Sequence, residues 1–286
     1  TLPVKAVAEH QATNIWELDL MPKRKYTIDS LAAALDVVES FVKSPDGARG
    51  VTEISRLTGL KKDRVFRVLS TMAERGYVEQ DKETQKYRLG SAFLVLGEAF
   101  RKQADLGQVA EPFLLELAEK SGDAAHLFVR HGHQAICLDV RVGRHVLQAK
   151  GTIGQILPCH TAAAPKILLA FLPAEQRKEV LDNTTFARLT PVTITSRSKL
   201  EKELAKIRAQ GYCVAEDDYE LGSHGIGAPI RDASGRVVAT LSVATPQSRY
   251  DPKRKAQLIE WVVDGARRLS ERLGYVHEPG GGAGSS

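Results

Sequence analysis

Two short segments of the sequence carry residues that could act as a nucleophile or a metal ligand. Cys159 and His160 are adjacent in "PCHTAAAPK", and His224 precedes Gly225 in a later loop. Zinc sites usually have closer ligand pairs in a recognisable spacing, and a nucleophilic cysteine needs a base that the fold holds beside it. The sequence shows neither pattern. It predicts no catalytic residue, no metal and no cofactor, and we expect the protein not to be an enzyme.

A run of basic residues could instead bind a polyanion. In "GLKKDRVFRVLSTM" the apolar residues that recur at helical spacing are Val65, Val68, Leu69 and Met72. Outside that face, mainly on its first two turns, lie Lys61, Lys62, Arg64 and Arg67. A solvated charged surface is the simplest interpretation of an isolated basic helix, so the neighbouring elements must decide.

Those neighbouring elements favour a winged helix-turn-helix. Residues 28–41 form a helix whose apolar stripe consists of Ile28, Leu31, Leu35, Val38 and Phe41. Thr52 as an N-cap and Gly59 as a stop bound a short second helix, and residues 60–75 form a third. "YVEQ" and "KYRLG" then flank the polar turn "DKET", which predicts a hairpin, the wing.

We therefore expect residues 27–89 to bind double-stranded DNA. In a helix-turn-helix, the first turns of the last helix enter the major groove. Side chains on the wing would contact phosphates, which fixes the register without reading sequence. The candidate DNA contacts are Thr52, Lys61, Lys62, Arg64, Arg67, Lys82, Lys86 and Arg88.

The charge distribution supports this expectation. The formal net charge is +5 over 286 residues, and residues 22–90 hold 14 Lys and Arg against 10 Asp and Glu. Nearly all the excess positive charge therefore lies in the first part of the chain, as in a polyanion-binding module joined to a near-neutral domain.

Other bulk features indicate a cytoplasmic protein without a membrane partner. The three cysteines have no paired spacing, and the apolar runs are shorter than the roughly 20 residues that span a bilayer. Met21 looks like a natural start, so the first 20 residues would be an addition without a fold of their own. We place the N-terminal extension at residues 1–26, before the first predicted helix. The glycine-rich residues 276–286 are expected to be a flexible tail.

The segments "TEISRLTGL…RVFRVLSTMAERGYV…YRLG" and "GYCVAEDDYELGSHGIGAPIRDASGRVVATLSVATP" carry a family resemblance. Over about residues 27–275 the chain resembles the IclR family of bacterial transcriptional regulators. The resemblance implies a winged helix-turn-helix, a linker helix and a C-terminal effector domain with a curved sheet related to GAF domains. It also implies dimers, often paired into tetramers, that control catabolic operons in response to a small molecule.

Residues 90–275 fit an α+β organisation. Phe93, Leu96 and Phe100 share one face of a linker helix at 90–104, which would pair with its twin or dock on its own chain. The effector domain, 105–275, would begin with a helix at 106–120 that Pro112 kinks or shortens. Strand-like runs follow, among them "HVLQAK" at 145–150, and a helix at 252–273 closes a mainly antiparallel domain.

The loop "PCHTAAAPK" leads into a helix whose first N–H groups have no internal partner. Either an anion binds there, or Thr161 caps the helix. The family resemblance favours the first alternative, because this loop lines the family's effector pocket and faces positions that match Gly225 and Ser242. The candidate effector contacts are His160, Thr161, Ala162, Ala163, Ala164, His224, Gly225, Ser242 and Ala244.

Three departures from the family pattern bear on the effector. Gly225 stands where a cysteine is frequent, Ala244 replaces a second pocket serine, and Ala215 replaces an acidic residue. Each change removes a polar group or volume, which favours a carboxylate with a bulkier, aromatic body over a small keto acid. The expected protein is a ligand-responsive repressor or activator of a catabolic operon. The alternative is a small-acid-binding enzyme or carrier with an incidental basic module.

Overall fold

The computed structural model describes residues 28–42, 44, 47–103, 105–147, 149 and 151–276. The expected N-terminal extension and nearly all of the expected tail lie outside these ranges. The chain divides into two compact units after Gln103. None of the helices in the described ranges is both long and apolar enough to cross a membrane.

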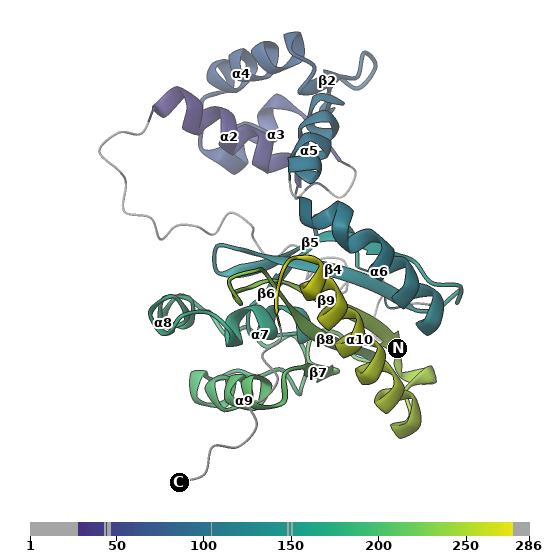
Figure 1. The fold of residues 1–286 in the computed structure, drawn as a ribbon. Helices are drawn as coiled ribbons and strands as arrows, with labels where there is room; N and C mark the ends of the chain where they lie inside the picture. Colours follow the sequence, from purple (N-terminus) through teal and green to yellow (C-terminus); the bar gives the residue numbers. More distant parts are fainter. Residues whose placement is uncertain are drawn as a thin grey trace. The chain divides into compact units, whose positions relative to one another are not determined.

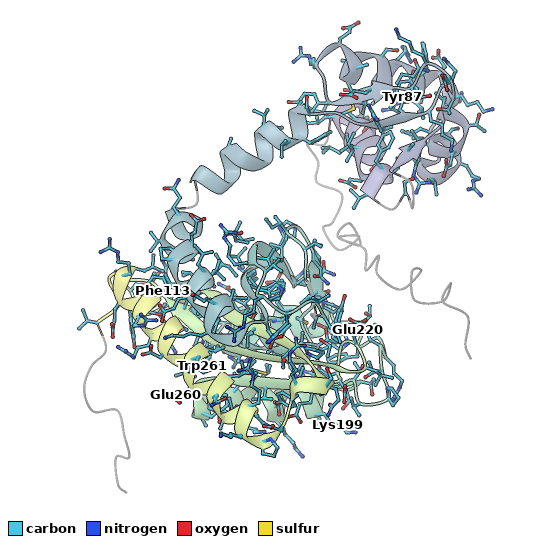
Figure 2. The ribbon with its side chains drawn as sticks, turned by 90° about the vertical axis from the view of Figure 1, so that its right-hand side faces the viewer. Tyr87, Phe113, Lys199, Glu220, Glu260 and Trp261 are labelled. Carbon is cyan, nitrogen blue, oxygen red and sulfur yellow. The ribbon has the colours of Figure 1, made fainter. Side chains whose placement is uncertain are left out.

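The N-terminal unit contains the three predicted helices and the predicted hairpin (Figure 1). Its elements are α2 (Asp29–Val42), β1 (Ala48–Arg49), α3 (Val51–Thr58), α4 (Lys62–Glu74), β2 (Val78–Gln80), β3 (Tyr87–Leu89) and α5 (Ala92–Gln103). The strands pair antiparallel in the order β1-β3-β2. Tyr87 belongs to the core of this unit together with Val37, Ile54 and Leu69 (Figure 2).

Two sequence-based expectations for this unit are wrong. Thr52 does not cap α3, because the helix already begins at Val51, with Gly50 as its N-cap and no side-chain bond. Helix α2 buries Ala33, Val37 and Phe41 instead of most of the predicted stripe. Three large apolar residues of that stripe are exposed: Leu31 and Leu35 on α2, and Ile28 directly before it.

The C-terminal unit is built on a six-stranded antiparallel sheet in the order β6-β5-β4-β9-β8-β7. Its strands are β4 (Ala124–His131), β5 (Gln134–Arg141), β6 (Ile156–Pro158), β7 (Cys213–Glu216), β8 (Ser223–Arg231) and β9 (Val237–Pro246). Its helices are α6 (Asp105–Ser121), α7 (Ala163–Ala170), α8 (Ala174–Asp182), α9 (Arg197–Gln210), η1 (Gln247–Arg249) and α10 (Pro252–Arg272). The α+β fold class with a mainly antiparallel sheet is confirmed.

Helices cover both faces of this sheet (Figure 1). On one face, apolar residues of β4, β8 and β9 pack against α6 and α10, to which Phe113 and Trp261 belong (Figure 2). On the other face α7 packs against the sheet, and α8 and α9 form a second core with it. Side chains alternate along each strand, so neighbouring residues of β8 serve different cores.

Two expectations for this unit need correction. Residues 144–147 form bends rather than the start of a strand at 145–150, and β6 is the strand that pairs with β5 instead. Of the two alternatives for Pro112, the late helix start is wrong, because α6 already begins at Asp105 and contains Pro112. Proline is tolerated there at the cost of one backbone hydrogen bond.

Candidate DNA-binding surface and effector site

The turn between α3 and α4 fixes the direction of the last helix. Gly59 ends α3 with a left-handed φ of 71°, a conformation that glycine adopts without steric cost. The Ser55 hydroxyl then donates to the Leu60 carbonyl at 2.6 Å, which ties the turn back to α3. Buried Arg49 donates to the Ser40 carbonyl at 2.7 Å and pairs with Glu53, so that α2, β1 and α3 are held together.

Helix α4 turns its apolar face inward as predicted. Val65 and Leu69 are fully buried, and Val68 and Met72 are partly buried against the same core. Lys61, Lys62 and Arg67 lie exposed on the outer surface. Arg67 also pairs with Asp63 at 3.3 Å, but both side chains are mostly in solvent, where such a pair stabilises little.

Arg64 has a different position from the other predicted contacts on α4. Its guanidinium donates to the Asp29 carbonyl at 2.6 Å, so it links α4 to the start of α2. Phe66, which the sequence analysis did not single out, is 52% exposed on α4. If α4 enters the major groove, such an exposed aromatic ring can contact the methyl group of thymine.

The wing presents its cations at and beside its tip. Lys82 is exposed in the turn, where the Asp81 carboxylate accepts the Thr84 N–H at 2.7 Å. Hydrogen bonds from the backbone N–H and the hydroxyl group of Thr84 hold the pKa of Asp81 below its ordinary value. Arg88 pairs with Glu79 of β2 at 2.9 Å, and Thr52 is exposed on the first turn of α3.

In the C-terminal unit, the first residues of the predicted effector loop are fixed by the protein itself. His160 is 1% exposed, and its Nε2 lies 2.9 Å from the Ala187 carbonyl. Thr161 is fully buried and donates to the Pro158 carbonyl at 3.2 Å, so it does not cap α7. Both side chains therefore shape the loop from within.

Cys159 is also part of this support. Its thiol lies 3.1 Å from the Thr184 hydroxyl, and burial raises the pKa of Cys159. Burial has the opposite effect on the imidazole of His160 and lowers its pKa, and its Nε2 lies beside the Ala187 carbonyl. A neutral thiol without a base is unreactive. Among the described residues, no group of three or more His, Cys, Asp or Glu side chains could hold a metal ion.

The start of α7 already holds a carboxylate from the protein. The Ala162 N–H donates to Asp218 Oδ1 at 3.0 Å, and Lys166 Nζ donates to Asp218 Oδ2 at 2.6 Å. Asp218 and Lys166 are 6% and 3% exposed. Ala162 has φ 54° and ψ 171°, a conformation that costs a non-glycine residue about 1–3 kcal/mol and is found mainly at functional sites.

The sheet contributes the opposite side of this region. In the pairing of β8 with β9, Gly225 lies opposite Ala244, and Gly227 lies opposite Ser242. A Cβ atom on Gly225 would lie 3.6 Å from the Cβ of Ala163, so a methyl group fits there and a larger side chain would press on α7. Ala162–Ala164, Gly225, Ser242 and Ala244 are thus brought to one face of the sheet.

His126 is a polar residue of this face that the sequence analysis missed. It lies opposite Ser242 in the pairing of β4 with β9, is 3% exposed, and accepts the Gly151 N–H at 3.1 Å. Burial lowers the pKa of His126 to about 4, so the ring is neutral at pH 7. Gln155 of the same turn donates to the Tyr219 hydroxyl at 3.4 Å.

His224 does not join this group. It precedes Gly225 on β8, so its side chain lies on the opposite face, where it stacks on Tyr250 with ring centroids 4.2 Å apart. Its Nε2 contacts Gln247. The alternation of the strand therefore separates His224 from the other candidate effector contacts.

Known proteins share both units. Residues 30–82 match the model of the IclR helix-turn-helix domain, and residues 99–271 match that of the C-terminal domain of bacterial IclR transcriptional regulators. The chain belongs to the IclR family of transcriptional regulators. It therefore binds DNA through its helix-turn-helix and carries an effector domain, and the family consists of regulators rather than enzymes.

Individual relatives extend over nearly the whole chain. The transcriptional regulator XynR of Escherichia coli K12 is 32% identical over 87% of this chain and 98% of its own length. The Thermotoga maritima IclR structure is 25% identical, covers 87% of this chain and all of its own, and has a TM-score of 0.70. An IclR homolog from Microbacterium hydrocarbonoxydans, solved with 4-hydroxybenzoate, is 26% identical, covers 85% and 98%, and has a TM-score of 0.74.

Proposed function

We propose that the protein regulates a catabolic operon in response to a small carboxylate with an aromatic body. The complex of the Microbacterium hydrocarbonoxydans homolog with 4-hydroxybenzoate is the observation that carries this proposal. The composition of the candidate site agrees with it, because its alanine and glycine residues leave mostly apolar walls with few polar groups.

The effector would lie between the loop at Ala162–Ala164 and the strands that carry Gly225, Ser242 and His126. The Ser242 hydroxyl and the neutral His126 ring each supply one oriented hydrogen bond. The ion pair of Asp218 with Lys166 holds the loop in its strained conformation beside the ligand. His160 and Thr161 act as positioning residues, because their polar atoms bond to other parts of the loop region.

Operator recognition is proposed to rest on α4 and the wing. Lys61, Lys62, Arg67 and Phe66 would face base edges, whereas Lys82, Lys86, Arg88 and Thr52 would meet phosphates. Arg64 would hold α4 against α2 through Asp29. The operator should be a near-palindrome, because we expect the protein to bind as a dimer or tetramer.

Calorimetry of the full chain against 4-hydroxybenzoate and pyruvate tests the effector assignment. We expect the aromatic acid to bind more tightly. Ser242→Ala should weaken it by roughly 1 kcal/mol, the usual effect of one lost hydrogen bond. Gly225→Leu should exclude it, because the side chain would fill the space beside Ala163.

Lys62→Ala is the matched control, since it should leave acid binding unchanged. The thermal transition of Gly225→Leu shows whether that variant still folds. Wild-type affinity for 4-hydroxybenzoate in a folded Gly225→Leu variant would place the effector elsewhere. Tighter binding of pyruvate would overturn the aromatic assignment.

A further inference from the structure

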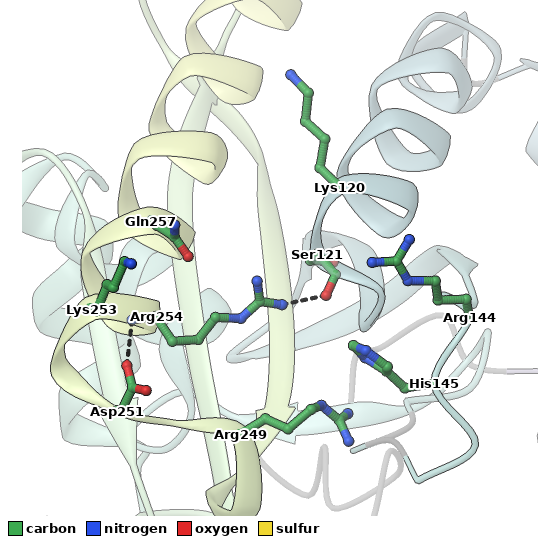
Figure 3. A pocket seen from close by; sticks show the side chains of 9 residues that line it. All are labelled: Lys120, Ser121, Arg144, His145, Arg249, Asp251, Lys253, Arg254 and Gln257. Atoms are coloured by element: carbon green, nitrogen blue, oxygen red, sulfur yellow. Dashed lines mark hydrogen bonds between the residues drawn. The ribbon is translucent and has the colours of Figure 1, made fainter.

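The C-terminal unit has a cavity of about 420 Å³ at the end of α6 and the start of α10 (Figure 3). These two helices cover the sheet face opposite α7, so the cavity is separate from the candidate effector site. Its lining contains one carboxylate, Asp251, and five cations besides His145. The cations are Lys120, Arg144, Arg249, Lys253 and Arg254.

Two glycines allow the chain segments that form one wall of this cavity to pack closely. A Cβ atom on Gly143 would lie 2.2 Å from the Gly122 carbonyl carbon, and one on Gly122 would lie 2.5 Å from the His145 ring. The His145 N–H also donates to the Gly122 carbonyl at 3.0 Å. The loop with Arg144 and His145 is therefore packed tightly on the end of α6.

A buried carboxylate orients the arginines. Asp123 is fully buried, contacts Arg249, and lies 3.3 Å from the Arg254 guanidinium and 3.4 Å from His145 Nδ1. Arg249 also donates to the Leu147 carbonyl at 2.7 Å. Figure 3 shows Arg254 reaching from α10 toward Ser121, to whose carbonyl it donates. The guanidinium groups are thus held in place before any ligand arrives.

The positive charge of the cavity is only partly compensated. Asp123 balances one cation, Lys120 pairs with Glu116 at 2.5 Å, and Asp251 caps α10 by accepting the Arg254 N–H at 2.7 Å. Arg144 and Lys253 have no ion-pair partner within the described ranges. Gathering like charges in one cavity costs free energy, and an anionic ligand would offset that cost.

We propose that this cavity binds a small polyanionic metabolite, with two or more phosphate or carboxylate groups, as a second ligand of the effector domain. The guanidinium group of arginine can donate two parallel hydrogen bonds to the oxygens of either a phosphate or a carboxylate. The volume falls within the range of small-molecule sites and exceeds what a lone inorganic ion needs. Side chains, rather than the already capped start of α10, would hold the ligand.

Calorimetry of the full chain at about 150 mM salt tests the site, with pyrophosphate and citrate as probes of the two chemistries. The double variant Arg144→Gln/Lys253→Gln removes the two unpaired cations without exposing Asp123. It should weaken the tighter-binding polyanion by about tenfold or more, as expected for two charged contacts. Its affinity for 4-hydroxybenzoate should not change, which separates this site from the proposed effector site.

Lys199→Gln/Lys202→Gln on α9 is the matched control, because it removes the same charge from exposed positions away from the cavity. We expect its polyanion affinity to stay within about twofold of wild type. Equal weakening in both double variants would mean diffuse attraction to a basic chain and would overturn the proposal. So would the lack of a saturable isotherm for both polyanions with the folded wild-type chain.

Discussion

His126 has a pKa of about 4 in the folded chain, far below its ordinary value of 6.5, because it is buried. Between pH 6.5 and pH 4 the unfolded chain binds this proton more readily than the folded chain. The free energy of unfolding therefore has its full value well above pH 6.5 and falls as the pH drops toward 4. This residue alone should remove about 2 kcal/mol of unfolding free energy between pH 7 and pH 5. Urea denaturation of wild type and His126→Gln at both pH values isolates its share; equal losses in the two proteins would contradict the assignment.

The pair of Asp218 and Lys166 gives a second prediction at this scale. Asp218→Asn leaves the Lys166 charge buried without its partner, which should cost about 3–5 kcal/mol. Asp218→Asn/Lys166→Met removes both charges and should recover much of that loss. Urea denaturation is the measurement, with exposed Glu220→Gln as a control that stays near wild type. A small effect of Asp218→Asn would mean that the pair does not hold the loop.

Residue types and motifs indicate the candidate effector loop but not the residues that contact it. His126 lies in an alternating strand pattern that is equally typical of a core histidine, and Asp218 is one of two adjacent aspartates in "AEDDYE". Their roles depend on pairings across 56 residues or between β4 and β9, which no local pattern contains. His224 and Gly225 are neighbours in the sequence, which suggests a shared site, but strand alternation puts their side-chain positions on opposite faces of the sheet.

At the scale of elements, the helix-turn-helix was predictable because its signals are local. Gly59, Gly76 and the polar turn at 81–84 each end an element by their own chemistry. Strand β1 has two residues and exists only through its pairing with β3, so its pattern is too short to detect. On α2, two sets of apolar residues fit helical spacing, and leucines lie on the exposed side whereas the buried side includes the small residue Ala33.

Helix α4 and the wing should respond differently to the loss of a positive side chain. Lys62→Ala and Arg67→Ala on α4 should each weaken specific operator binding by about 1–3 kcal/mol per lost base contact. Lys86→Ala on the wing should weaken all DNA sequences alike and reduce the salt dependence by about one counterion. Fluorescence anisotropy with the DNA upstream of its own gene and with unrelated DNA, at two salt concentrations, separates the cases. Unchanged operator affinity in all three variants would remove these residues from the DNA contacts.

At the scale of the whole molecule, exposed apolar residues gather on two helices of the N-terminal unit. The α2 group consists of Ile28, Leu31 and Leu35, which are 51–64% exposed, and the α5 group consists of Leu94, Val95 and Leu96, which are 51–76% exposed. Of the residues predicted on one face of the linker helix, Phe93 packs edge-on against Tyr77 of its own chain, with ring centroids 5.2 Å apart. The side chain of Phe100 lies outside the described part. Apolar groups of this kind mark an interaction surface.

We expect these two groups to be buried between two copies of the chain, so that wild type sediments as a dimer or larger assembly at micromolar concentration. Leu31→Asp and Leu96→Asp place a charge in that contact, where burial without a partner is costly, and should shift the chain toward monomer. Leu221→Asp changes a leucine of the C-terminal unit that is 65% exposed, more than either test residue, and this variant should sediment as wild type does.

Operator affinity should fall in the Leu31→Asp and Leu96→Asp variants and not in the Leu221→Asp variant, because a palindrome is read by two helices held at a fixed spacing. A monomeric wild type, or tight operator binding by a monomeric variant, would show that recognition does not depend on pairing through α2 and α5.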